Sequence, residues 1–391
     1  MSDRPIYLDY QATTPLDSRA LDAMLPYLRE DFGNPHSIQH AYGRTAEAGV
    51  EQARGEVADL ICADVREIVF TSGATEANNL AIVGAARFRQ RMGDGVARVL
   101  TFAFEHKCVL EAAKSLAGEG FEVEILPVTK DGLADLDALE AALKTPTTLV
   151  SLMAVNNEIG TIQPIAEAAK LTRAAGALLH VDAAQAVGKI PVDVAALGVD
   201  LMSVSGHKMY GPKGVGALYV RRRPRARLLP IFHGGGQERG FRSGTVPAPL
   251  CVGFGAAAAL AAAEMTEEAA RLAGIRDAFL KALDDAGADY AINGDRQSRI
   301  PGNLNVAFAG APALDVMNAA PGVAVATGSA CSSASVEPSY VLRALGASEE
   351  LAARSLRIGF GRRTTRAEAE DGARQLAAAA ASVARGREAA E

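Results

Sequence analysis

The sequence predicts an α/β protein in which a mainly parallel sheet lies between helices and is followed by a smaller α+β domain. Between about residues 65 and 220, short runs rich in β-branched residues alternate with amphipathic, alanine-rich segments. Such alternation is typical of parallel strands joined by helices that cover the sheet. After residue 260 the pattern changes to longer helices around two short strand-like runs, which indicates the second domain.

Each strand of the predicted sheet is a short, mostly apolar run of strand length. These runs are residues 66–71, 98–104, 121–128, 147–155, 177–184, 200–205 and 214–220. In the second domain, helical patterns cover residues 261–283 and 367–385, and the strands are NLNVAFAG and SLRIGFG. We predict a large domain over residues 16–260 and a small domain made of residues 1–15 and 261–391.

The composition is that of a globular protein with a full core, since 49% of the 391 residues are hydrophobic. Lys and Arg number 40 against 46 Asp and Glu, and the net charge of −6 argues against nucleic acid as the main partner. The basic run RRRPRAR, residues 221–227, is either a solvated loop or a docking surface.

The cysteines and the apolar runs indicate the compartment. Cys62, Cys108, Cys251 and Cys331 lie far apart without C-x-x-C spacing, which argues against disulfides or a metal site and predicts a reducing, cytoplasmic setting. The first ten residues lack the apolar core of a signal peptide. The longest apolar run, residues 250–263, is shorter than the ~20 residues of a membrane helix. We therefore expect a soluble protein.

Polar residues follow five of the predicted strands. In open α/β sheets, ligands bind beyond the carboxyl ends of the strands, so these residues are candidates for a site. They are Thr75 and Glu76; Glu105, His106 and Lys107; Asn156, Asn157 and Glu158; Asp182 and Gln185; and Ser205, His207 and Lys208. Each of them alone could have a structural role, as a helix cap or as a hydrogen-bonded residue of the core. Their convergence at one sheet edge, however, predicts a binding site.

The run GHKMYGPKG, residues 206–214, does not fit a P-loop. Pro212 follows Gly211 and Gly214 follows Lys213, whereas a P-loop has Lys and then Ser or Thr directly after its second glycine. We interpret Lys208 instead as an amine at a strand end that can form a Schiff base.

Together these residues meet the binding demands of pyridoxal phosphate, which are a Schiff-base lysine, a carboxylate for the ring nitrogen and a helix N-terminus for the phosphate. Lys208 and Asp182 supply the first two from separate strands. Thr75, Ser205 and His207 can hold the phosphate. His106 is placed to lie over the ring and to move protons.

Seven longer motifs resemble one known family, the cysteine desulfurases of the NifS/IscS type, in the same order and over nearly the whole chain. They are LDYQATTP, TSGATEANN, AVNNEIGTIQP, VDAAQAVGKI, SVSGHKMYGPKGVGALYVRR, GGGQERGFRSGT and GSACSSASVEPSYVLRALG. The resemblance implies a homodimer with the fold-type-I architecture of pyridoxal-phosphate enzymes. It also implies removal of sulfur from L-cysteine, leaving alanine and an enzyme persulfide.

The resemblance also implies a role for individual residues. It makes Lys208 the Schiff-base lysine, Asp182 the partner of the ring nitrogen, Gln185 a contact of the ring hydroxyl and His106 the residue stacked on the ring. The phosphate would be held by Ala74, Thr75, Ser205 and His207, with Thr245 reaching in from the other subunit. The substrate carboxylate would be held by Asn34, Asn157 and Arg357, the last through its guanidinium fork.

Cys331 matches the persulfide-forming cysteine of the family. It lies in a long run of small residues, about 325–337, which resembles the longer-looped group of the family and would let the thiol move between cofactor and surface. An acceptor protein or iron–sulfur scaffold would then take the sulfur, and Cys331 could transiently ligate a cluster there. Members of the IscS type continue past the final helix into a docking tail, whereas this sequence ends in VARGREAAE, which leaves the acceptor open.

Two alternatives remain at this stage. One is a selenocysteine lyase or another class V lyase that needs no enzyme thiol. The run of small residues that contains Cys331 argues against this alternative. The other is a non-catalytic phosphate-binding or sulfur-carrier module.

Overall fold

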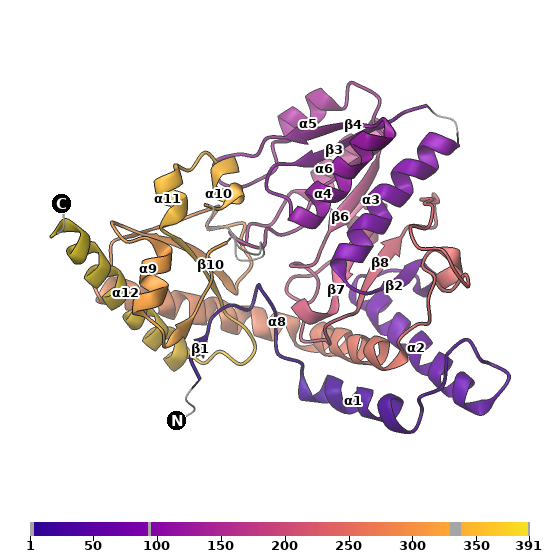
Figure 1. Cartoon of the computed structure of the whole chain (residues 1–391), viewed down its shortest axis with the longest axis horizontal. Coiled ribbons are helices and arrows are strands. Elements are labelled where there is room, and N and C mark those ends of the chain that lie inside the picture. Colours follow the sequence, from indigo (N-terminus) through magenta and orange to yellow (C-terminus); the bar gives the residue numbers. More distant parts are fainter. Residues whose placement is uncertain (1–3, 93–94, 329–337, 390–391) are drawn as a thin grey trace.

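The computed structural model describes residues 4–92, 95–328 and 338–389, and its centre is a seven-stranded sheet (Figure 1). The order across the sheet is β2-β8-β7-β6-β5-β3-β4. The strands are β2 (Ile68–Thr71), β3 (Arg98–Phe102), β4 (Glu122–Leu126), β5 (Leu149–Ser151), β6 (Leu178–Asp182), β7 (Leu201–Ser205) and β8 (Gly216–Val220). Each lies inside a run predicted as a strand, so these predictions are confirmed.

The sheet is mainly parallel, as predicted. Strands β4, β3, β5, β6 and β7 run parallel, whereas β8 is antiparallel to both of its neighbours, β7 and β2. Only residues 206–215 separate β7 from β8. This connection is too short for the helical crossover that parallel neighbours need, so β8 must return antiparallel.

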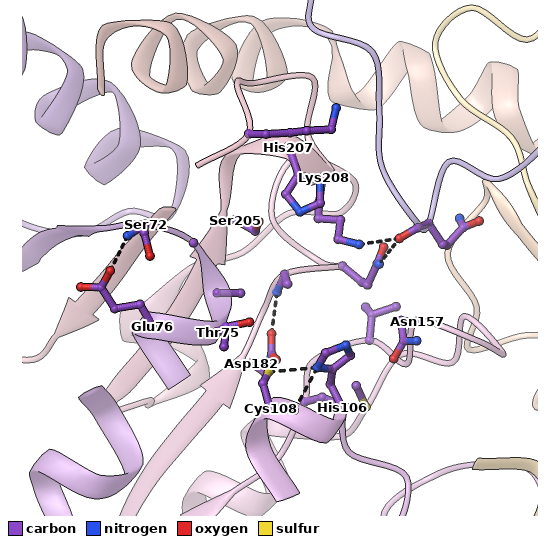
Figure 2. A pocket seen from close by; sticks show the side chains of 18 of the residues that line it. Ser72, Thr75, Glu76, His106, Cys108, Asn157, Asp182, Ser205, His207 and Lys208 are labelled. Atoms are coloured by element: carbon purple, nitrogen blue, oxygen red, sulfur yellow. Dashed lines mark hydrogen bonds between the residues drawn. The ribbon is translucent and has the colours of Figure 1, made fainter. Parts of the chain in front are cut away.

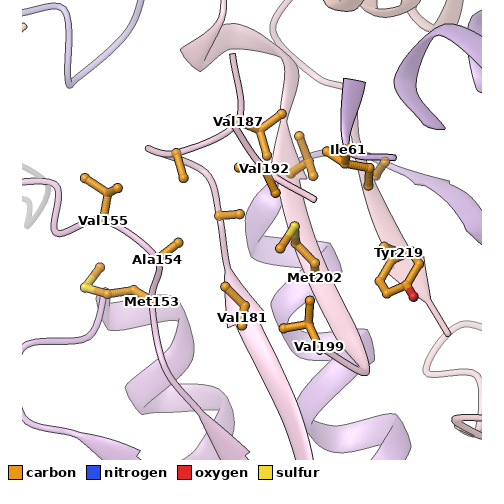
Figure 3. Close-up of a cluster of buried hydrophobic side chains, with 14 of the residues drawn as sticks. Ile61, Met153, Ala154, Val155, Val181, Val187, Val192, Val199, Met202 and Tyr219 are labelled. Atoms are coloured by element: carbon orange, nitrogen blue, oxygen red, sulfur yellow. The ribbon is translucent and has the colours of Figure 1, made fainter. Parts of the chain in front are cut away.

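Helices cover both faces of the sheet. Side chains of one strand alternate between two apolar clusters, with Phe70 in one and Val69 in the other. The Phe70 cluster includes residues of α2 (Ala41–Leu60), α5 (Leu136–Ala142), α6 (Ile165–Ala174), α7 (Val194–Leu197) and α8 (Ala248–Asp285). The Val69 cluster includes residues of α3 (Ala74–Arg91) and α4 (Lys107–Ser115). Figure 3 shows part of the first cluster, where Val181 of β6 and Met202 of β7 pack together.

A separate apolar core lies beside the sheet. It includes residues of β10 (Asn303–Phe308), β12 (Ser355–Gly359), α9 (Ala313–Ala319), α12 (Arg366–Glu388) and the C-terminal half of α8. Strand β10 pairs antiparallel with β12 and with β9 (Tyr290–Ile292), while β1 (Ile6–Tyr7) pairs parallel with β11 (Val323–Ala324). The N-terminal residues therefore pack beside the C-terminal part of the chain (Figure 1).

Helix α8 joins the two cores. Its Phe254 belongs to the sheet core and its Phe279 to the second core. Residue 260, where we predict a domain boundary, lies inside this continuous helix, and the division into domains stays a prediction. The short helices α10 (Tyr340–Ala344) and α11 (Glu349–Ala353) pack on the sheet core, and α1 (Ser18–Arg29) packs on α8.

By length and composition, α8 is also apolar enough to cross a membrane. Its buried side chains contact both cores, which is how the central helix of a globular fold is packed.

Candidate active site

A cavity of about 370 Å³ opens at the carboxyl ends of the parallel strands. Figure 2 shows Thr75, Asp182, His106 and Lys208 around it, brought there by different elements. Among the predicted site residues, those that line it are Ala74, Thr75, His106, Asn157, Asp182, Gln185, Ser205, His207, Lys208 and Arg357. The convergence expected from the strand ends is thus present, since parallel strands end at one edge of a sheet.

One wall of the cavity is the N-terminus of α3. Its N-cap residue, Gly73, has φ 147°, a conformation open mainly to glycine, and no side chain caps the helix. Gly216 of β8 passes close by, since a Cβ there would lie 2.7 Å from Gly73 Cα. Among the described residues, no N-cap side chain accepts from the first backbone N–H groups of this 18-residue helix, which therefore favour an anion.

Glu76 lies in the same turn of α3, and its charge is balanced. The carboxylate accepts hydrogen bonds from Ser72 N (2.8 Å) and from Arg242 Nε (2.8 Å). Burial alone would raise the pKa of Glu76, but Arg242 and Ser72 outweigh it and lower the pKa. The pairing leaves the helix N-terminus able to attract an anion despite the nearby acid.

Asp182, at the end of β6, is held in a fixed orientation. Its Oδ2 accepts from Asn78 Nδ2 at 2.7 Å and its Oδ1 accepts from Ala184 N at 3.0 Å. Asn78 comes from α3 and is fully buried. Sequence reasoning did not single out Asn78, although it lies in the SGATEANN run beside Thr75.

His106 caps the N-terminus of α4. Its Nδ1 accepts from Cys108 N at 3.2 Å and lies 2.9 Å from Cys108 Sγ. Since a backbone N–H can only donate, Nδ1 carries no proton and the neutral ring has its hydrogen on Nε2. Burial lowers the pKa of His106, with Lys208 and Lys107 acting in the same direction against Asp182. The ring is therefore neutral near pH 7.

Cys108 lines the cavity, and sequence reasoning did not assign it to the site. Burial raises its pKa to about 12, so it is a thiol and not a thiolate under ordinary conditions. The sequence feature that could have indicated a place for Cys108 in the site is its position two residues after His106, at the start of a helix.

Lys208 lies in the short 3₁₀ turn η3 (Gly206–Lys208) after β7. Its amine donates to two backbone carbonyls, Gln11 O at 2.7 Å and Ala12 O at 2.8 Å. The amide of Gln185 donates to the same Gln11 O at 2.8 Å. Lys189, four residues further along the chain, donates to Gln185 Oε1, so the Gln185 NH₂ faces Gln11.

Arg357 of β12 reaches the cavity from the second core. Its guanidinium donates to Asp9 Oδ1 at 2.8 Å and to Asn157 O at 3.4 Å. Within the part of the chain that the structure describes, Arg357 Nε and Asn157 Oδ1 are buried without a hydrogen-bond partner. Unsatisfied buried polar atoms are costly, and a ligand polar group would satisfy them.

Two of the residues that the resemblance places in the site do not line the cavity. Asn34 is exposed between α1 and α2, where its side chain accepts from His36 N. Thr245 is exposed between the 3₁₀ turn η4 (Glu238–Gly240) and α8. Cys331 lies outside the described residues.

Fold and cavity together define an α/β enzyme whose lysine, carboxylate and helix N-terminus meet at one sheet edge. The family model described as "Aminotransferase class-V" matches residues 6–371. The chain is 52% identical to "Cysteine desulfurase IscS" of Rickettsia bellii, over 93% of this chain and 88% of the relative, and 54% identical to human "Cysteine desulfurase" over 94% and 80%.

Solved structures agree with these relatives. "NIFS-LIKE PROTEIN" matches with a TM-score of 0.87 and 35% identity, over 96% of this chain and 98% of that one. "SspA in complex with cysteine" matches with 0.81 and 37%, over 91% and 98%. The chain belongs to the class-V aminotransferase family, in its group of NifS/IscS-type cysteine desulfurases. The predicted family, fold class, enzyme class and cofactor, pyridoxal phosphate, are confirmed.

Proposed function

We propose that this cysteine desulfurase removes sulfur from L-cysteine, giving L-alanine and a persulfide on Cys331, which passes the sulfur to an acceptor protein. One observation carries the proposal. Within the described residues, one cavity of about 370 Å³ is surrounded by a helix N-terminus without a side-chain cap, an anchored carboxylate, a lysine amine and a guanidinium whose Nε–H has no partner. This set fits a phosphorylated pyridine aldehyde together with an amino acid.

Different residues of the cavity would bind different groups of the cofactor. Lys208 would hold it through the amine, Asp182 would hold the ring nitrogen, and Gln185 the ring hydroxyl. Its phosphate would lie at the start of α3, among Ala74, Thr75, Ser205 and His207. When bound, pyridoxal phosphate supplies an electron sink for the substrate carbon.

His106 would lie over the ring and move protons there. Because its hydrogen is on Nε2 while Nδ1 accepts from Cys108 N, the neutral ring offers an N–H donor at Nε2. To take up a proton at Nε2, the ring would first have to adopt the other neutral tautomer, with its hydrogen on Nδ1. The lowered pKa of His106 keeps the ring neutral at neutral pH.

Arg357 and Asn157 would hold the substrate carboxylate. The role of Asn34 as a third contact stays a prediction, since Asn34 is exposed and does not line this cavity. The Arg357 Nε–H, which has no partner in the part of the chain that the structure describes, is a suitable donor for the carboxylate. This would direct the substrate's sulfur away from Arg357 and leave it open to attack.

Sulfur transfer then balances without an external oxidant. The thiolate of Cys331 forms an S–S bond to the substrate sulfur while the substrate's C–S bond breaks, with the electron pair passing to carbon. The carbon fragment takes up a proton and leaves as L-alanine. The persulfide sulfur is available to an iron–sulfur scaffold or another acceptor.

We also propose a cytoplasmic homodimer. Large apolar side chains lie exposed around Asn34, at Leu28, Phe32, Ile38 and Tyr42. Exposed apolar surface of this kind is characteristic of an interface, and a second copy that covers it would bring segments of one subunit towards the other.

Replacing Cys331 with Ser tests the proposal directly. Sulfide release from L-cysteine in the presence of a thiol reductant should fall by at least about 100-fold, because an unactivated hydroxyl is a poor nucleophile. Bound-cofactor absorbance should be unchanged. Cys62→Ser, at an exposed cysteine, is the matched control and should keep full activity. Sulfide release retained by Cys331→Ser would contradict the proposal and favour a thiol-independent lyase.

A further inference from the structure

The segment of residues 9–14 contacts several side chains of the cavity, and its Gln11 lines the cavity itself. Asp9 pairs with Arg357 at 2.8 Å. The carbonyl of Gln11 accepts from Gln185 Nε2 and Lys208 Nζ. Thr13 Oγ1 lies 3.0 Å from His207 Nδ1. One short stretch of LDYQATTP, whose function the site description leaves unassigned, thus touches four residues that line the cavity.

We propose that Thr13 is a positioning residue that fixes the ring orientation and tautomer of His207, so that its second nitrogen can donate to the cofactor phosphate. This rests on the proposed function, in which His207 is a phosphate ligand.

The chemistry of the imidazole supports this role. Burial, with Lys208, Lys213 and Lys189 acting in the same direction, lowers the pKa of His207 to about 4, so the ring is neutral at working pH. A neutral imidazole has one N–H donor and one acceptor nitrogen. A phosphate offers only acceptors at neutral pH, so the ring must present N–H to it. Nδ1 must then accept, and the Thr13 hydroxyl is the group in reach that can donate.

The neighbouring threonine has a different task. Thr14 N and Thr14 Oγ1 both donate to the carbonyl of His207, at 3.1 and 2.9 Å, and Thr14 Oγ1 accepts from Tyr210 N at 2.8 Å. Thr14 therefore fixes the main chain of η3, while Thr13 contacts the imidazole ring. Thr14 is buried and Thr13 only partly so, so a change at Thr13 should spare the fold.

Thr13→Val and Thr13→Ser form a matched pair. Valine keeps the shape and removes the hydroxyl, whereas serine keeps the hydroxyl. In titrations of the apo-protein followed by absorbance, the Kd for pyridoxal phosphate should rise about 3- to 10-fold in Thr13→Val, as expected for the loss of one hydrogen bond, and stay at the wild-type value in Thr13→Ser.

Pyridoxal, which lacks the phosphate, separates this role from general damage. Its affinity should be equal in wild type and both variants, as should the KM for L-cysteine at saturating pyridoxal phosphate and the urea midpoint of the apo-protein.

Other results would overturn the inference. Wild-type affinity in Thr13→Val would show that the hydroxyl does not position His207. Equal weakening by Val and Ser, or a matching loss for pyridoxal, would assign the effect to packing. If the wild-type protein bound no pyridoxal phosphate, that result would contradict the proposed function itself. Titration of the wild-type protein tests this before any variant is made.

Discussion

Asn78 and Asp182 form a buried hydrogen bond of 2.7 Å that ties the third helix to the end of the sixth strand. The same Asn78 amide donates to Cys108 Sγ at 3.1 Å. Because Cys108 in turn contacts His106, one asparagine connects the carboxylate proposed for the ring nitrogen with the residue proposed to lie over the ring. Asn78 is fully buried, so neither bond can be replaced by water without rearrangement.

Asn78→Leu should therefore weaken both the fold and the cofactor site. Leucine is close in size but leaves the Asp182 carboxylate without its side-chain donor, and the free energy of unfolding of the apo-protein should fall by about 1–3 kcal/mol. Urea unfolding followed by circular dichroism measures this, and retention of pyridoxal phosphate through gel filtration should drop in parallel. Asn79→Leu is the matched control, because the Asn79 side chain makes a partly exposed bond to Thr75 O. Equal effects of the two changes would show that the bond to Asp182 is not special.

Lys189→Met should change how stability depends on pH. Burial lowers the pKa of Lys189 to about 7, with Lys208 and Arg357 adding to the effect against Glu268. Between about pH 7 and 10, the unfolded chain then holds a proton at this lysine that the folded chain lacks. Lys189 therefore makes the free energy of unfolding rise with pH across that window, and its contribution to stability is least favourable below pH 7.

The difference in unfolding free energy between wild type and Lys189→Met, measured from pH 6 to 10, should therefore shift in favour of wild type as pH rises. Exposed Lys130→Met is the control and should give a flat difference. A flat difference for Lys189→Met as well would mean that this lysine stays charged in the fold. The bound cofactor's absorbance should also change in Lys189→Met, since the Gln185 amide is then free to rotate.

The positions of strands and of most site residues could be predicted from sequence because both follow from local pattern. Runs such as residues 98–104 are mostly apolar, and β-strands buried on both faces need that pattern. Polar residues after such runs, including His106 and Asp182, must emerge at the same edge. The antiparallel return of β8 was not predicted, although the short connection after Lys208 requires it.

Contacts between distant segments could not be predicted in this way. Asn78 and Cys108 are 30 residues apart along the sequence, and Thr13 and His207 are 194 residues apart. Nothing local in the sequence marks such a pair. The beginning of α8 was also missed, because the Ala- and Gly-rich residues 250–263 have no helical polar face. Gly253 and Gly255 let α8 pack closely against Met24 and Ala53. This packing is a tertiary contact, which the local sequence pattern does not indicate.

Mixing two variants that are impaired at different residues of the site tests whether Thr245 serves the other subunit. Thr245 is exposed and does not line the cavity of its own chain, which suits a residue that acts across a dimer interface. A heterodimer of a Lys208→Ala chain and a Thr245→Ala chain has two sites. If Thr245 acts across the interface, its loss falls on the site already disabled at Lys208, and the other site keeps both native residues. Desulfurase activity, assayed at limiting pyridoxal phosphate so that a lost phosphate ligand is felt, should then recover towards half of the wild-type value per heterodimer. If Thr245 acts within its own chain, neither site is whole, and a mixture with confirmed heterodimers would show no recovery.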